Sequence, residues 1–191
     1  DMRPKNGQLY ALGSSSRIYT INASSGVAAV VGGQLTTSLT GSQFGFDFNP
    51  LADRIRIVSN LGQILRINPD DASQNVDPPI TLLNAAISGA AYINNFAGTA
   101  TTVLFDIDAS TDRLYRQDPP NNGVLVDIGP LGINIENTNG FDIGGTSGIA
   151  YGIFTVGTTQ RIYTVNLTTG AATQMAVFTP AAKAFTLGLG F

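Results

Sequence analysis

One phrase of this chain occurs twice, and that return constrains the fold more than any other feature. Residues 17–22 read RIYTIN near the start, and residues 161–166 read RIYTVN near the end. A glycine follows each copy at the same interval, as Gly26 and Gly170. Self-similarity of this kind is typical of an array built from one repeated unit. The sequence therefore predicts a repeat protein.

A second marker sets the length of the repeat. Aspartate recurs beside apolar residues as Asp1, Asp47 and Asp142. A degenerate copy of this marker covers residues 89–92, and residues 187–191 lie at the same position of the repeat. The copies are separated by about 46, 44, 51 and 46 residues, which is the length of a four-stranded propeller blade. The chain is therefore expected to hold about four blades.

Alternating apolar and polar residues predict strands within each repeat. Ile55 and Ile57 alternate with arginines, and Leu65 and Ile67 flank Arg66, so we expect these four apolar side chains to be buried. Asn, Asp and Gly clusters between such segments are typical of hairpin turns. The predicted fold is all-β: a propeller-like array of about four four-stranded repeats plus a surplus C-terminal strand. It forms one domain over 1–191, with repeats at approximately 1–43, 44–86, 87–138 and 139–184 and a terminal strand at 185–191.

The composition indicates how the surface is covered. Charged residues make up 12% of the chain and the mean hydropathy is +0.14, against about 25% charged residues in ordinary soluble domains. Part of the surface is therefore expected to be covered by copies of the same chain. The alternative is that hydroxyl and amide groups keep a monomer in solution.

Several functional classes are disfavoured. A net charge of −3 and a pI near 4.6, with scattered cations, argue against nucleic acid as a partner. Histidine and cysteine are both absent, which removes the commonest catalytic bases, thiol chemistry and disulfides. No apolar run is long enough to predict a membrane span. We expect no enzyme activity and no cofactor. Because the sequence starts at Asp1, we expect a processed product whose leader lies outside it.

The candidate site residues are aspartates in or beside turns. Asp47 and Asp142 are predicted to fix nearby turns by accepting backbone hydrogen bonds. Asp70, Asp71 and Asn75 lie in a segment interpreted as a solvated hairpin loop, with calcium binding as the alternative, although the EF-hand pattern is missing. Asp106 and Asp108 have the spacing of a carboxylate pair on one strand face, for which structural roles are favoured over glycoside hydrolysis.

Three motifs together carry a resemblance to a known family. They are GQLYALG at 7–13, FGFDFNP at 44–50 and PPNNG at 119–123. With the RIYTIN phrase, these segments resemble the domain-of-unknown-function 4394 family, a set of bacterial secreted or surface proteins with propeller-like repeats. The resemblance implies export and a propeller-like fold. It supplies no catalytic residues to carry over.

The expected function is a non-enzymatic extracellular or cell-surface structural protein. It is predicted to self-associate into an oligomer or filament through β-edge or blade contacts, with the uncharged C-terminal segment as the assembly element. The residues assigned to assembly are Phe185, Leu187, Leu189 and Phe191. The alternative is a monomeric secreted module that binds a cell-surface or matrix carbohydrate, a peptide or calcium through propeller loops. Asn22 and Asn166, which lie in glycosylation sequons, are interpreted as turn residues.

Overall fold

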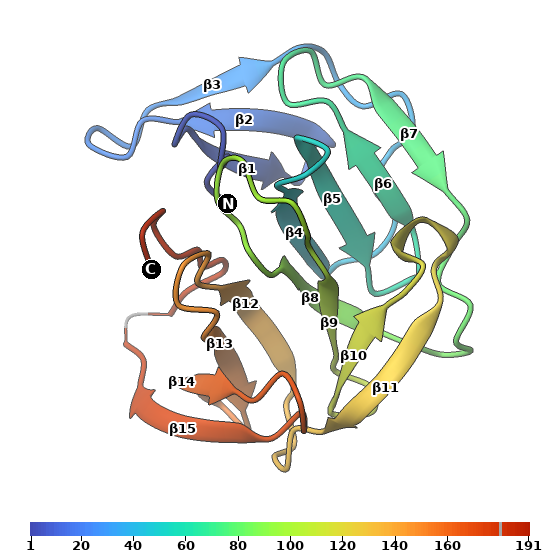
Figure 1. Cartoon of the computed structure of the whole chain (residues 1–191), viewed down its shortest axis with the longest axis vertical. Helices are drawn as coiled ribbons and strands as arrows, with labels where there is room; N and C mark the ends of the chain where they lie inside the picture. The colour runs from blue at the N-terminus through green and yellow to red at the C-terminus, as the bar shows by residue number, and fades with distance from the viewer. Residues whose placement is uncertain (180) are drawn as a thin grey trace.

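The protein is a four-bladed β-propeller (Figure 1). The computed structural model describes residues 1–179 and 181–191. Four antiparallel sheets follow one another along the chain around a common axis, and a single 3₁₀ turn, η1 (Pro120–Asn122), is the only helical element of the described residues. The expected all-β propeller with four repeats is confirmed.

Each sheet is made of consecutive strands joined by tight turns. The first blade has three strands and the other three have four. The strands of the first two blades are β1 (Leu9–Gly13), β2 (Arg17–Ile21), β3 (Ala28–Val31), β4 (Phe44–Asn49), β5 (Arg54–Ser59), β6 (Ile64–Ile67) and β7 (Gln74–Asp77). Those of the last two are β8 (Ile87–Tyr92), β9 (Leu104–Asp108), β10 (Arg113–Gln117), β11 (Leu125–Pro130), β12 (Asn137–Ile143), β13 (Ala150–Val156), β14 (Thr159–Val165) and β15 (Ala172–Val177).

The turns follow from the asparagines of the repeat. Asn22 Oδ1 accepts hydrogen bonds from the backbone N–H groups of Ser24 and Ser25, both at 3.0 Å. Asn166 Oδ1 accepts equivalent bonds from the second and third residues after it, at 2.8 and 3.1 Å. An Asn side chain that binds its own backbone in this way favours a turn over a continued strand. The RIYTIN phrase is thus one strand together with the turn that ends it.

The hydrophobic core lies between blades rather than at one centre. One cluster joins the first and second blades and contains Tyr10, Phe48 and the four residues expected to be buried: Ile55, Ile57, Leu65 and Ile67. A second cluster joins the second and third blades around Val58 and Tyr92, and a third joins the third and fourth around Phe141 and Phe154. The burial prediction is confirmed, because these four side chains have no exposed surface.

The junction between the fourth and first blades is built differently. Residues 181–191 fill it, and both termini lie on this side of the ring (Figure 1). The first blade has at its inner position only Asp1 and Met2, with Met2 forming an isolated bridge to Leu9. The expected strand over 185–191 is not formed, because this segment is held by side-chain and terminal contacts instead of a β-ladder.

Candidate functional site

Three aspartates link the inner strands around the axis. Each occupies the same position of its repeat, and each accepts a hydrogen bond from a backbone N–H of the neighbouring inner segment. The bonds run from Phe48 N to Asp1 at 3.0 Å, from Tyr92 N to Asp47, and from Leu187 N to Asp142 at 2.6 Å. A buried carboxylate that accepts backbone N–H bonds makes charge-assisted bonds that are stronger than neutral ones. These side chains therefore link neighbouring inner segments of the ring.

Thr186 connects the last of these aspartates with the first. Its Oγ1 lies 2.9 Å from Asp1 Oδ1 and 3.0 Å from Asp142 Oδ2, so it contacts the first and last aspartates together. Thr186 precedes Leu187 just as Asp47 precedes Phe48, which places it at the aspartate position of a fifth inner segment. In the third blade the equivalent residue is Ala91, and there the link is a 2.8 Å contact between the hydroxyls of Ser88 and Thr138.

The sequence signalled part of this arrangement. Asp47 and Asp142 were expected to accept backbone hydrogen bonds in turns, but both lie on inner strands, and the bonds from Tyr92 and Leu187 cross between inner segments. Asp142 also accepts a bond from Ile143 N, one residue further along the chain. The sequence shows that aspartate recurs at the same position of the repeat. That these aspartates meet at the axis follows only from the closure of the ring.

The aspartate cluster is electrostatically unbalanced. Burial raises the pKa of Asp47 well above its ordinary value, and the nearby charge of Asp142 raises it further. Burial likewise raises the pKa of Asp142, against the hydrogen bonds from Leu187 and Thr186. Burial also lowers the pKa of the Asp1 amino group to about 6. Among the described residues no lysine or arginine forms an ion pair with these three carboxylates.

The calcium alternative suggested by the sequence falls on residues that are engaged elsewhere. Asp70 forms a 2.6 Å ion pair with Arg3, and that bond lowers its pKa. Asp71 accepts a 2.8 Å bond from Ser73 N within its own turn. Asn75 lies on the exposed outer strand β7. Over 1–179 and 181–191, the acidic cluster able to surround a metal ion is instead Asp1, Asp47 and Asp142.

Asp106 and Asp108 do not face a shared cavity. Both side chains are fully buried on β9. Asp108 accepts bonds from Ala86 N, Ser110 N and the hydroxyls of Ser110 and Thr111, which is a structural arrangement. Neither carboxylate oxygen of Asp106 has a hydrogen-bond partner within the described part of the chain, and burial raises the pKa of Asp106 to about 8. Asp106 is therefore a neutral acid in the core at pH 7.

The residues assigned to assembly lie along the chain's own fourth junction. Phe185 packs against the backbone of Gly140 on β12, and Leu189 approaches Gly7 near the first blade. The carbonyl of Phe191 accepts bonds from Thr146 N at 2.6 Å and Ser147 N at 3.0 Å. Phe185 and Leu187 are half-buried, whereas Leu189 and Phe191 remain exposed.

A cavity of about 570 Å³ is lined in part by Asp1. Its walls come from β1, from the starts of β4, β8 and β12, and from residues 181–185. Asp1 and Lys183 are the charged residues of this lining, which otherwise consists of apolar, hydroxyl and amide groups. Such a lining can hold a polar neutral molecule.

Two residues near the cluster had no signal in the sequence. Thr186 belongs to the C-terminal segment, for which the sequence predicts a strand. Asn95 follows β8 in the degenerate repeat, and its Nδ2 lies 3.4 Å from Asp1 Oδ2. Neither residue belongs to a motif, so only the folded ring brings them to the aspartates.

Comparison with known families identifies the sequence pattern. The profile of the family described as "Domain of unknown function (DUF4394)" matches residues 1–188. Comparison with curated proteins found no match. The described residues contain no helix with the length and hydropathy of a membrane span.

Solved structures with a similar fold come from functionally diverse proteins. A chain of a nidogen/laminin complex shares 14% identity with a TM-score of 0.62, over 95% of this chain and 63% of that one. The Dos1 propeller shares 12% identity with a TM-score of 0.50, over 94% and 47%. A putative 6-phosphogluconolactonase from Bacteroides uniformis shares 17% identity with a TM-score of 0.50, over 91% and 52%. The chain thus spans less than two thirds of each, and at these identities the likeness concerns the fold alone.

Proposed function

The chain belongs to the DUF4394 family, and from the surfaces of its outer strands we propose that it is a non-enzymatic structural protein that assembles with copies of itself through the outer edges of its first and last blades. Propellers host many unrelated activities, so the function has to be argued from particular surfaces. The observation that carries the proposal is the lack of charge along two exposed edge strands.

The two edges in question are β3 and β15. Each is the last strand of its sheet. Residues 18–46, which include β3, contain no charged residue, and neither do residues 162–182, which include β15. By contrast, the outer strand β11 carries Asp127, whose charged side chain is 51% exposed. Proteins ordinarily protect an edge strand with charge or proline, and an edge without such protection pairs with another strand.

Apolar side chains are exposed along both edges. Val27 and Val30 at β3 are 64% and 49% exposed, and Met175 and Val177 on β15 are 58% and 56% exposed. Pairing β3 of one copy with β15 of the next covers these side chains and satisfies the backbone groups of both edges. Because the two edges are different surfaces, such contacts are head-to-tail and lead to a ring of subunits or a filament.

A charge placed on either edge tests the proposal. We expect Val30→Lys or Met175→Lys to turn a concentration-dependent oligomer into a monomer in sedimentation velocity, with loss of any filaments in negative-stain images. Val76→Lys is the matched control, because Val76 is 58% exposed on the outer strand β7. A wild-type chain that sediments as a monomer at every concentration contradicts the proposal, as does a control that abolishes assembly equally well.

A second candidate function is the binding of a neutral polar ligand, such as a carbohydrate, in the central cavity. The lining contains the amides of Gln43, Asn137, Asn139 and Gln160. Asn137 Oδ1 is buried, and none of the described residues forms a hydrogen bond with it. Saturable binding of a sugar by a monomer, abolished by Asn137→Leu, would favour this alternative over assembly.

We place the protein outside the cell or on its surface, in line with what the family resemblance implies. Low charge and the absence of cysteine are compatible with such a setting but do not require it. Fractionation of the producing cells, with an antibody to the chain, tests the location. Signal confined to the cytosol would contradict it.

A further inference from the structure

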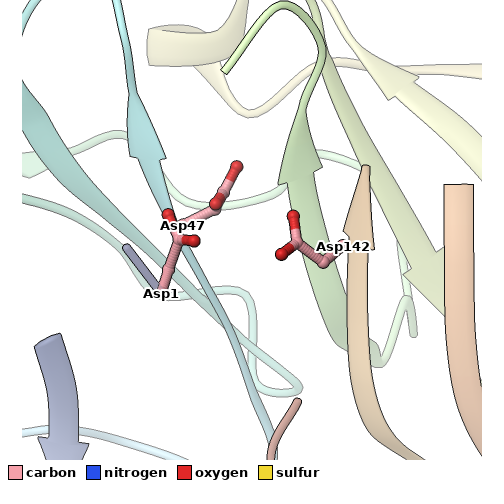
Figure 2. A group of neighbouring side chains, drawn as sticks. All are labelled: Asp1, Asp47 and Asp142. Atoms are coloured by element: carbon pink, nitrogen blue, oxygen red, sulfur yellow. The ribbon is translucent and has the colours of Figure 1, made fainter. Parts of the chain in front are cut away.

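The three aspartates at the axis face one another. Asp47 comes from β4, Asp142 from β12, and Asp1 from the inner position of the first blade. One carboxylate oxygen of each lies within 4.8 Å of those of the other two. Figure 2 shows Asp142 pointing across the axis towards the side chains of Asp1 and Asp47. Oxygen atoms converge here from three separate segments of the chain.

This convergence is costly without a positive charge at its centre. Asp47 and Asp142 are 1% and 4% exposed, and buried carboxylates stay ionised only when they are paired or coordinate a metal. The hydrogen bonds from Phe48, Tyr92 and Leu187 satisfy some lone pairs of the cluster, but they bring no net charge. The amino group of Asp1 lies near Asp47 and Asp142 and can offset one of the three negative charges. The remaining negative charge has to be removed by protons or balanced by a cation.

The amide of Asn95 lies beside the cluster and is the candidate for a fourth ligand. Asn95 is 6% exposed, and its amide points at Asp1 with Nδ2 3.4 Å from Oδ2. Its Oδ1 is buried and has no hydrogen-bond partner among the described residues. A buried acceptor without a donor calls for an unseen partner. The two ends of an amide are also interchangeable by a rotation, which brings the oxygen to the carboxylates once a cation lies between them.

We propose that Asp1, Asp47, Asp142 and Asn95 bind one calcium ion on the propeller axis. Calcium takes only oxygen ligands at about 2.3–2.6 Å, so two oxygens on opposite sides of one ion lie about 5 Å apart. The carboxylate oxygens already meet this limit. Magnesium requires shorter bonds in strict octahedral geometry, and thiol or imidazole ligands for softer metals are absent from the chain.

The ion would hold the ring together. Its ligands come from the first, second and fourth blades and from the segment after β8 of the third, so every blade would be attached to one centre. Thr186 contacts two of the ligands, which would couple the fourth junction to the site. Calcium binding is therefore a structural function, and it does not depend on assembly through β3 and β15.

Calorimetric titration of the EDTA-treated chain with CaCl2 is the direct test. We expect one ion to bind per chain at neutral pH. Calcium at about 100 times its Kd should raise the Tm by about 5–10 °C, since a ligand specific for the folded state stabilises it by mass action. MgCl2 at the same concentration should produce a clearly smaller rise.

Variants of Asn95 separate a ligand from a merely structural residue. Asn95→Ala should weaken calcium binding by at least about tenfold. Asn95→Asp adds a fourth carboxylate, so its Tm should fall in EDTA and its calcium-induced rise should exceed that of the wild type. Asp71→Asn, at the loop suggested by the sequence, is the control and should bind like the wild type. A Tm that stays unchanged at about 5 mM CaCl2 overturns the proposal, because this concentration saturates even weak extracellular calcium sites. Calcium effects that are identical in both Asn95 variants overturn it as well.

Discussion

At the scale of single residues, Asp106 makes the stability of the protein depend on pH. Burial raises its pKa to about 8 in the folded chain, whereas an unfolded Asp titrates near 3.9. Between these values the folded state holds a proton that the unfolded state has released, so the free energy of unfolding falls as pH rises. The contribution of the protonated Asp106 to the free energy of unfolding is complete below about pH 4 and is lost by about pH 8.

Asp106→Asn should reduce this pH dependence, because an amide keeps the shape of the neutral acid without titrating. We expect the Tm of the wild type to fall more steeply from pH 5 to pH 8 than that of the variant. Asp47 and Asp142 have raised pKa values and contribute in the same direction, so a smaller slope should remain. Asp71→Asn serves as the control, since the pKa of this exposed residue is lowered below the window. Equal slopes in wild type and Asp106→Asn would refute the assignment.

The sequence could not distinguish these aspartates from one another. Asp47, Asp70 and Asp106 all lie beside turns or apolar residues, and nothing local separates a residue on the axis from one in a surface ion pair or in the core. In the structure Asp47 lies on the axis, Asp70 pairs with Arg3, and Asp106 lies in the core with no hydrogen-bond partner among residues 1–179 and 181–191. Burial and charge neighbours decide their chemistry, and both depend on which blades become adjacent.

At the scale of elements, close contact between inner strands depends on glycine. A Cβ on Gly45 of β4 would lie 2.5 Å from the backbone nitrogen of Ala90 and 2.9 Å from the carbonyl carbon of Gly89 on β8. Backbone atoms in a strand cannot move aside cheaply, so a side chain here forces the two blades apart. Gly45 is thus a packing requirement of the second junction.

Gly45→Ala should lower the free energy of unfolding by about 1–3 kcal/mol, as overpacking usually does. Urea denaturation measures the change. Gly33→Ala is a suitable control, because no atom lies within 4 Å of the position of its Cβ. If the two substitutions changed the free energy of unfolding equally, the close approach of β4 and β8 would not contribute to stability.

Strands and turns were largely predictable, whereas the ends of the array were not. Alternating residues such as Ile55 and Ile57 report on their own strand, and Asn22 specifies its own turn, so local sequence suffices for both. The segment 185–191 has the composition of a strand, yet its contacts with Asp142, Thr146 and Ser147 hold it in another conformation. Those contacts exist only when the ring is closed.

At the scale of the whole molecule, the C-terminal segment stabilises the fourth junction. Deleting residues 185–191 removes the contacts of Thr186 with Asp1 and Asp142, together with the bond from Leu187 to Asp142. Hydrogen bonds to charged groups contribute about 1.5–3 kcal/mol each. We therefore expect the truncated chain to melt at a lower temperature.

Thr186→Val is the finer version of this experiment, since it keeps the shape of the side chain and loses the hydroxyl contacts. A fall in Tm of several degrees is expected in differential scanning calorimetry, against little change for Leu189→Ala, whose side chain is 42% exposed. A truncated chain that melts like the wild type would show that the segment does not hold the ring.

The links between blades also limit how many repeats the described ring can hold. In a linear solenoid each unit contacts only its neighbours, so units can be added at an end with little change elsewhere. Here Asp1 and Asp142 share Thr186, and the first and last repeats meet as directly as consecutive ones. An added or lost repeat would move these partners apart and leave their buried carboxylates unsatisfied. Inserting a whole repeat into this ring is therefore expected to require a rebuilt junction as well.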